Sequence, residues 1–125
     1  MRSVALFLLL FLSACSLFAP SGPNYVVYFQ ERSAQLDTSA RRVVAQVAKR
    51  ARADPAAPVE VRGYTDSAGS PQADVFLSQQ RAQAVSDALM ANGVAANRLE
   101  RKGQGQTGSN PGVASRRVEI TVGGL

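Results

Sequence analysis

The chain has 125 residues, no histidine, no tryptophan and a single cysteine, and its formal net charge is +5. One cysteine cannot form an intramolecular disulfide, and a chain without histidine has no Ser–His or Cys–His pair and no evident transition-metal site. The mildly basic charge is dispersed along the chain and does not by itself indicate nucleic-acid binding. We therefore expect no metal, no cofactor and no nucleic-acid partner.

The first residues, MRSVALFLLLFLSAC, have the layout of a secretory signal peptide, with Arg2 before an apolar core from Val4 to Leu12. That core is shorter than the ~20 residues that a helix needs to span a bilayer. Residues 12–15, LSAC, resemble the bacterial lipobox, which implies cleavage after residue 14 and acylation of Cys15. An ordinary signal peptide with an incidental cysteine is the alternative.

The expected organisation has three parts: a signal peptide at 1–14, a lipidated Cys15 with a short linker at 15–24, and one domain at 25–125. Each buried CH₂ group of an acyl chain contributes ~0.8 kcal/mol, so several chains hold a soluble domain durably on a membrane. Ser16 stands where an aspartate would signal inner-membrane retention in such lipoproteins. The resemblance therefore implies an outer-membrane lipoprotein whose domain faces the periplasm.

Hydrophobic periodicity predicts a strand, a helix and a second strand in the first half of the domain. YVVYF at 25–29 is β-branched and aromatic, as strands are. A helix follows over 39–53, capped by Asp37 or Thr38, and Asp54 before a proline ends it. The basic residues of this helix are predicted to form its solvated side, with contact to lipid headgroups as the alternative. The second strand is PVEVRG at 58–63.

The second half is predicted to contain one helix and two strands. A polar loop covers residues 64 to about 72, and a helix follows over 73–93 with Gly93 at its C-cap. Its apolar stripe is formed by Phe76 or Leu77 with Val85, Ala88 and Leu89. A short strand at 97–103, a flexible loop at 103–112 and an alternating strand at 116–124 complete the chain. The fold class is α+β, a two-layer β-α-β-α-β-β sandwich in which two helices pack on one face of a mixed four-stranded sheet.

Asp66, just after the second strand, and Arg81, near the start of the second helix, are the candidate functional pair. A strand–loop–helix unit of this length can bring both side chains to one cleft. There Asp66 could accept hydrogen bonds from an ammonium group, while Arg81 binds a carboxylate through two parallel N–H···O hydrogen bonds. From spacing alone, a structural salt bridge between Asp66 and Arg81 is the stronger interpretation.

The segments GYTDSAG and FLSQQRAQAVSDAL resemble the signature of the OmpA-like peptidoglycan-binding domain family. Three further segments, VYFQERSAQL, NGVAANRLERKGQGQ and SRRVEI, resemble the family in the same order along nearly the whole mature chain. The resemblance implies non-covalent binding to the peptide stem of peptidoglycan at its diaminopimelate residue. It assigns Asp66 as the residue that binds the ammonium group and Arg81 as the residue that binds the carboxylate.

The resemblance also assigns neighbouring positions to the candidate site. These are Thr65, Tyr64, Leu77, Ser78, Asp74 and Arg116, of which Arg116 is the first of two closing arginines. Tyr64 stands in place of the family's histidine and Asp74 in place of a frequent asparagine. Asp74 could instead cap the second helix, and Arg116 could be simply an outward residue of the last strand.

Three functions from different classes follow from these residues. The first is a module that tethers the outer membrane to the cell wall. The second is a structural partner of other envelope or motility-complex proteins, in which the peptidoglycan site is degenerate. The third is a cell-wall hydrolase, which would require paired acids from among Glu60, Asp66 and Asp74. We expect the chain not to be an enzyme, because the sequence offers no strong acid–base pair.

Overall fold

The computed structural model describes residues 24–66, 69–107 and 112–123. The expected signal peptide, Cys15 and linker therefore lie outside the described residues, apart from Asn24. The elements, in chain order, are β1 (Asn24–Tyr28), α1 (Thr38–Ala53), β2 (Val59–Thr65), α2 (Pro71–Ala91), the 3₁₀ turn η1 (Ala96–Arg98), β3 (Leu99–Gln106), the 3₁₀ turn η2 (Val113–Ser115) and β4 (Arg117–Val122). Within the described part of the chain, no helix is both long and apolar enough to cross a membrane.

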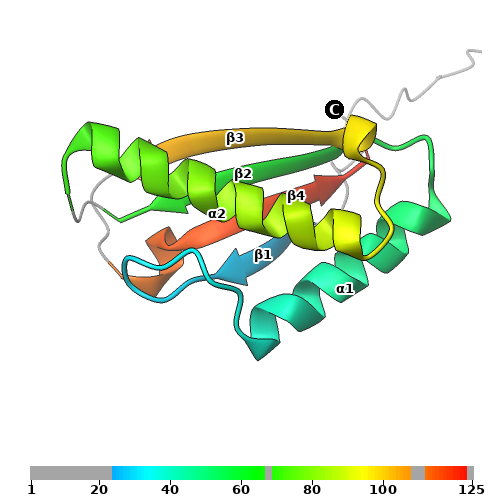
Figure 1. The fold of residues 1–125 in the computed structure, drawn as a ribbon, viewed down its shortest axis with the longest axis horizontal. Helices are drawn as coiled ribbons and strands as arrows, with labels where there is room; N and C mark the ends of the chain where they lie inside the picture. The colour runs from blue at the N-terminus through cyan, green and yellow to red at the C-terminus, as the bar shows by residue number, and fades with distance from the viewer. Residues whose placement is uncertain (1–23, 67–68, 108–111, 124–125) are drawn as a thin grey trace, which may run out of the picture.

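The strands form one mixed sheet in the order β1-β4-β2-β3. β4 runs antiparallel to both of its neighbours, whereas β2 and β3 are parallel because α2 carries the chain back across the sheet. Both helices cover the same face of the sheet (Figure 1). The predicted α+β sandwich is thereby confirmed.

The core lies between this sheet face and the inner stripes of the two helices. Residues of β2 alternate strictly between buried and half-buried, as expected for a sheet with one covered face. Val61 and Ile120 are fully buried from the sheet, and Val47, Val85 and Leu89 are fully buried from the helices. The opposite sheet face carries charged side chains, so the domain has a single core on one side of the sheet.

Side-chain caps and a glycine set the helix ends. Asp37 accepts a hydrogen bond from the Ala40 amide at 2.8 Å, which confirms the predicted cap of α1. Ser70 caps α2 by accepting from the Ala73 amide, and Pro71 opens the helix. The prediction that α2 begins at residue 73 was therefore wrong by two residues. Gly93 follows α2 with a φ of 93°, the left-handed conformation expected there.

The segment predicted as a flexible loop at 103–112 is in part a strand. β3 continues through Gln106 beside β2, and the Thr107 amide still donates to the Thr65 carbonyl at 3.2 Å. Glycines suggested a loop here, but they serve close packing instead. A Cβ on Gly103 would lie 2.4 Å from Gln79 Cγ, so α2 can rest on β3 only because this position has no side chain.

Gly63 plays the same part in β2. A Cβ at this position would lie 2.0 Å from the Ser78 carbonyl oxygen, so the backbones of β2 and α2 touch here. The contact fixes which α2 residues face the sheet: Ser78, Arg81 and Ala82 are buried there. Phe76, one candidate for the apolar stripe, is instead 60% exposed, and Leu77 is half-buried. Gly63 therefore positions Arg81 under the end of β2.

Candidate ligand-binding site

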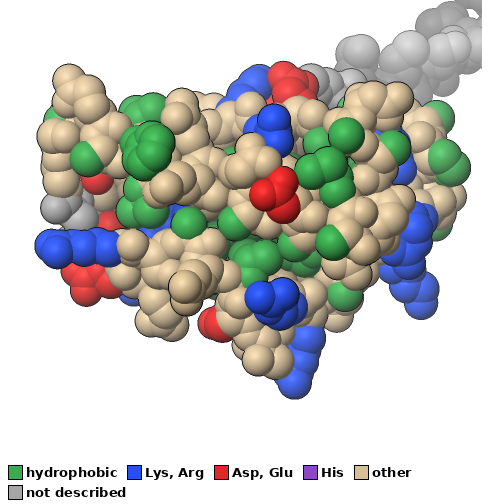
Figure 2. All heavy atoms as spheres, in the orientation of Figure 1, with side chains coloured by type: hydrophobic (Ala, Val, Ile, Leu, Met, Phe, Trp, Pro, Cys, Tyr) green, Lys and Arg blue, Asp and Glu red, His purple; other side chains and the backbone are tan. Residues whose placement is uncertain are grey.

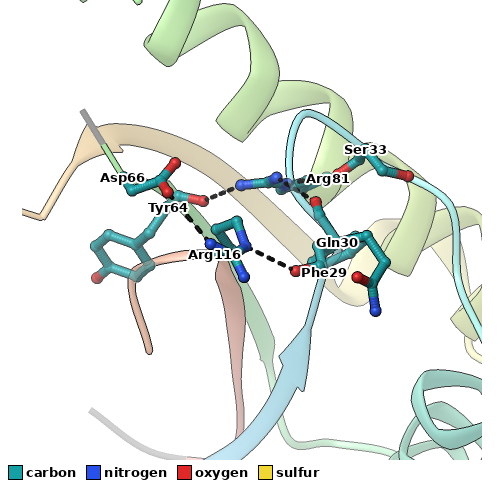
Figure 3. A network of polar contacts seen from close by, with 7 residues as sticks. All are labelled: Phe29, Gln30, Ser33, Tyr64, Asp66, Arg81 and Arg116. Carbon is teal, nitrogen blue, oxygen red and sulfur yellow. Dashed lines mark hydrogen bonds and ion pairs between the residues drawn. The ribbon is translucent and has the colours of Figure 1, made fainter. Parts of the chain in front are cut away.

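Asp66 and Arg116 meet at the end of the sheet where β2 finishes. Asp66 directly follows β2, and Arg116 lies between η2 and the first residue of β4. Arg116 Nη1 lies 3.4 Å from Asp66 Oδ2, and its Nε donates to the Phe29 carbonyl at 3.1 Å. The two side chains retain 18% and 13% of their exposure, so water or a small ligand can reach the pair. Figure 3 shows them facing each other.

Arg81 is fully buried next to this pair. Its Nε donates to the Ser33 carbonyl at 2.8 Å, Nη1 to that of Tyr64 at 3.1 Å and Nη2 to that of Gln30 at 3.1 Å. The guanidinium carbon also lies 5.3 Å from the centre of the Phe29 ring. These bonds leave one N–H on each of Nη1 and Nη2 for another acceptor.

Arg81 remains charged although its surroundings lower its pKa and no direct ion pair between described residues supports it. Burial lowers the pKa of its guanidinium, the nearby carboxylate of Asp66 opposes that shift, and the positive charge of Arg116 adds to it. An arginine stays protonated in spite of such a shift, since its ordinary pKa is very high. Asp66 thus acts on Arg81 through space although its ion pair is with Arg116.

The salt bridge weighed between Asp66 and Arg81 is therefore replaced by a different arrangement. Among the described residues, the carboxylate pairs with Arg116, and Arg81 binds backbone carbonyls instead (Figure 3). The pairing was missed because the acceptors for Arg81 are main-chain oxygens of the segment before α1, for which residue types give no signal. All three charged residues nevertheless converge at one place.

Tyr64 and Thr65 contribute in unequal ways. The Tyr64 ring lies on the uncovered face of the sheet, with Arg117 Cζ 4.4 Å from its centre, and only its carbonyl contacts Arg81. The Thr65 side chain points into the fold, is fully buried, and its hydroxyl has no hydrogen-bond partner among the described residues. The ring at position 64 is thus directed away from Arg81, whereas the Thr65 hydroxyl is available for a further bond.

The α2 residues of the expected site mostly hold that helix to β3. Asp74 is 3% exposed and accepts from Gln106 Nε2 at 2.6 Å. Its predicted alternative role as the helix cap was wrong, because Ser70 is the cap. The Ser78 hydroxyl donates to the Val75 carbonyl at 2.7 Å and accepts from the Gly105 amide at 3.0 Å. These residues fix the wall beside Arg81.

Glu60, the third acid that a hydrolase could use, lies away from Asp66 and Asp74. Glu60 accepts from Arg62 Nε at 2.7 Å on the uncovered sheet face and has Lys102 3.5 Å away. Asp74 is bonded to Gln106, and Asp66 pairs with Arg116. Within the described residues there is also no group of three or more acidic, histidine or cysteine residues that could hold a metal ion. Asp66, Arg81 and Arg116 therefore place charges of both signs at one end of the sheet.

The chain is similar in sequence to two bacterial proteins of known name. It is 39% identical over 113 residues to the probable lipoprotein YiaD of Escherichia coli, an alignment covering 82% of this chain and 50% of YiaD. It is 37% identical over 106 residues to the peptidoglycan-binding protein ArfA of Mycobacterium tuberculosis, covering 77% of this chain and 32% of ArfA. The chain therefore aligns with half or less of the length of these relatives.

A solved structure agrees with the fold described above. The peptidoglycan-associated lipoprotein of Burkholderia pseudomallei superposes with a TM-score of 0.72 at 26% sequence identity. The superposition covers 78% of this chain and 89% of that one, so it includes most of both proteins. The sequence pattern of the OmpA family matches residues 28–119, which hold all of the candidate ligand-binding residues. Fold and sequence together establish that this chain belongs to the OmpA family.

Proposed function

We propose that this domain binds the peptide stem of peptidoglycan non-covalently and holds the outer membrane to the cell wall. The observation that carries the proposal is the convergence of Asp66, Arg116 and Arg81 at the end of β2, where a carboxylate and two guanidinium groups meet. Diaminopimelate offers a free ammonium and a free carboxylate on one carbon. Such a zwitterion complements a site that holds charges of both signs.

On binding, the ion pair between Asp66 and Arg116 is replaced by two ion pairs with the ligand, one through its ammonium and one through its carboxylate. The Asp66–Arg116 contact is long, at 3.4 Å, and both side chains keep some exposure, so a ligand can displace it. The ligand ammonium replaces Arg116 as the partner of Asp66. Movement of Arg116 away from Asp66 uncovers the remaining N–H groups of Arg81, which are buried in the free protein, and these groups and Arg116 then bind the ligand carboxylate. Arg81 is already fixed by three carbonyls, so little side-chain entropy is lost when it takes part.

A weak site is sufficient for tethering. Hydrogen bonds to charged groups contribute ~1.5–3 kcal/mol each, so two or three of them, net of ordering costs, give a roughly millimolar to micromolar Kd. The wall repeats the same stem at high density, and a membrane anchor keeps the domain next to it. Effective concentration therefore compensates for modest affinity, and no catalysis or cofactor is required.

The anchor in this proposal is an acylated Cys15, which places the domain in the periplasm on the inner side of the outer membrane. The lipoprotein names of YiaD and of the Burkholderia structure support that placement, and the name of ArfA supports the ligand. The acids weighed for a hydrolase do not meet in one cleft, which favours binding over turnover.

Sedimentation with purified cell-wall sacculi tests the proposal, with the full lipidated chain in detergent. Asp66→Asn and Arg116→Gln each remove one charge and keep the approximate side-chain shape. We expect each to reduce the bound fraction at least about tenfold, since one charged contact is lost. Asp87→Asn and Arg101→Gln are the matched controls, because both residues are exposed and lie away from the site.

Two results would contradict the proposed site. Equal sedimentation of wild type and both site variants would mean that sacculi are bound elsewhere. Failure of the wild type to sediment would favour the second candidate function, a protein that docks to other envelope or motility-complex components. Circular dichroism of each variant checks that a loss of binding is not a loss of folding.

A further inference from the structure

Positive charge is concentrated on helix α1. It contains five basic residues and no acidic residue, and all five are exposed: Arg41, Arg42, Lys49, Arg50 and Arg52. Outside α1, residues 15–125 hold eight Lys and Arg against nine Asp and Glu, so α1 accounts for the whole positive balance of the mature chain. Lys and Arg side chains follow α1 along the lower right of the molecule in Figure 2. We call these five residues the basic face.

Interactions within the fold do not explain this face. None of the ion pairs between described residues involves α1. The helix dipole favours cations only in the last turn, where Arg50 and Arg52 lie, and Arg52 also donates to the Asn92 carbonyl. Arg41, Arg42 and Lys49 gain nothing from the dipole. Uncompensated charges on one helix point to an anionic surface as their partner.

The basic face continues to the end of the domain at which the chain emerges from the anchor. β1 begins at Asn24 beside Thr121, and β2 begins beside Val122 shortly after α1 has ended. The last turn of α1 and the start of β1 are therefore at one end of the sheet, as Figure 1 shows. β1 runs from this end toward Phe29, so Asp66 and Arg116 lie at the opposite end.

The linker is short enough to keep this face near the membrane. Eight residues, 16–23, separate Cys15 from Asn24, so the connection has nine Cα–Cα steps. A flexible chain of that length has a root-mean-square span of about 15–18 Å. The attraction of basic side chains to anionic lipids extends over a Debye length, about 10 Å at 0.1 M salt. A linker of this span allows the basic face to come within a Debye length of the lipid surface and keeps it from moving far away.

We propose that the basic face of α1 rests on the anionic phospholipid headgroups of the membrane that holds the acylated Cys15. The contact orients the domain, because the candidate ligand-binding site at the other end then points away from the membrane. This inference rests on the proposed acylation but not on the identity of the ligand. It adds a second membrane signal to the acyl chains, a combination that stabilises peripheral attachment.

The test uses the full lipidated chain in vesicles that carry a nitroxide quencher on a fraction of the headgroups. A fluorophore is attached at Ala45→Cys, which lies between Arg41 and Lys49 on the exposed side of α1. Labelling is specific because Cys15 is the only native cysteine and its thiol is acylated. A second chain labelled at Val113→Cys, 56% exposed at the site end, is the positional control.

We expect at least about twofold stronger quenching at position 45 when about a third of the lipid is phosphatidylglycerol than in pure phosphatidylcholine. The fluorophore at position 113 should show no such difference. About 0.5 M salt should remove the effect, because the Debye length then falls to about 4 Å. Lys49→Glu/Arg50→Glu should abolish it as well.

Arg32→Glu/Arg101→Glu is the matched control for net charge, since it makes the same change at exposed positions outside α1. It should leave quenching at position 45 unchanged. The proposal is overturned if quenching at position 45 is independent of lipid charge, or if both double variants lower it equally. Mass spectrometry showing an unacylated chain would overturn it too. Sacculus sedimentation in detergent is a separate measurement, so failure of the wall-binding site remains distinguishable.

Discussion

Arg81 joins the loop after β1 to the end of β2, and its replacement by alanine tests how the site is held together. The guanidinium bonds the carbonyls of Gln30 and Ser33 on one side and that of Tyr64 on the other. Arg81→Ala would leave the carbonyls without their donor and open a cavity in a fully buried position.

The expected loss of stability follows from these contacts. An unsatisfied buried polar group costs ~1–3 kcal/mol, and the three carbonyls are only partly buried, so together they account for roughly 3–5 kcal/mol. For a domain of about 100 residues, each kcal/mol lowers the Tm by roughly 4–8 °C. We therefore expect the Tm of Arg81→Ala to fall by at least about 12 °C.

Thermal unfolding followed by circular dichroism measures this change. Arg101→Ala is the control, because Arg101 is an exposed arginine with an expected effect within about 0.5 kcal/mol. Arg81→Lys keeps the charge but cannot reach three carbonyls, so its Tm should lie between those of Arg81→Ala and wild type. A Tm for Arg81→Ala within a few degrees of wild type would refute the structural role assigned to this residue.

Two further variants test the local packing and the helix cap. Gly63→Ala places a Cβ 2.0 Å from the Ser78 carbonyl oxygen and should strongly lower the midpoint of urea unfolding. Gly69→Ala is the control, because its Cβ meets only ordinary contacts; equal midpoints for the two variants would show that α2 can shift away from β2. Ser70→Ala removes the α2 cap and should cost about 1 kcal/mol in the same assay, and an unchanged midpoint would mean that the cap contributes nothing.

Variants of Asp66 and of Arg81 should differ in whether they affect ligand binding alone or also the stability of the fold. Asp66→Asn breaks a long, partly exposed pair, so ligand binding should be lost with little effect on unfolding. Arg81→Ala should lower both ligand binding and the stability of the fold, because this arginine holds the loop after β1 to the end of β2. Asp66 and Arg116 are therefore the informative positions for the wall-binding proposal, and Arg81 is informative for the fold.

Local signals along the chain determined most of the secondary structure. Asp37 and Gly93 mark helix ends through bonds and backbone angles that depend on a few neighbouring residues. The alternation in VEVRG and RVEIT depends only on one covered sheet face. The family motif, recognised from the order of short segments, predicted a site at the end of β2 and the start of α2, where Asp66, Arg81 and Arg116 converge.

Tertiary structure decided the features that depend on residues distant in the chain. Composition indicated a loop at 103–112, but β3 extends to Gln106 because β2 supplies its hydrogen bonds and the glycines admit α2. Asp66 was matched with Arg81 from spacing, yet its partner is Arg116, 50 residues away in sequence. Arg81 binds main-chain oxygens, which every residue type carries. The sequence determined which charges are present. The pairing of β2 with β4 brings Asp66 to Arg116, and the packing of α2 on Gly63 brings Arg81 beside them.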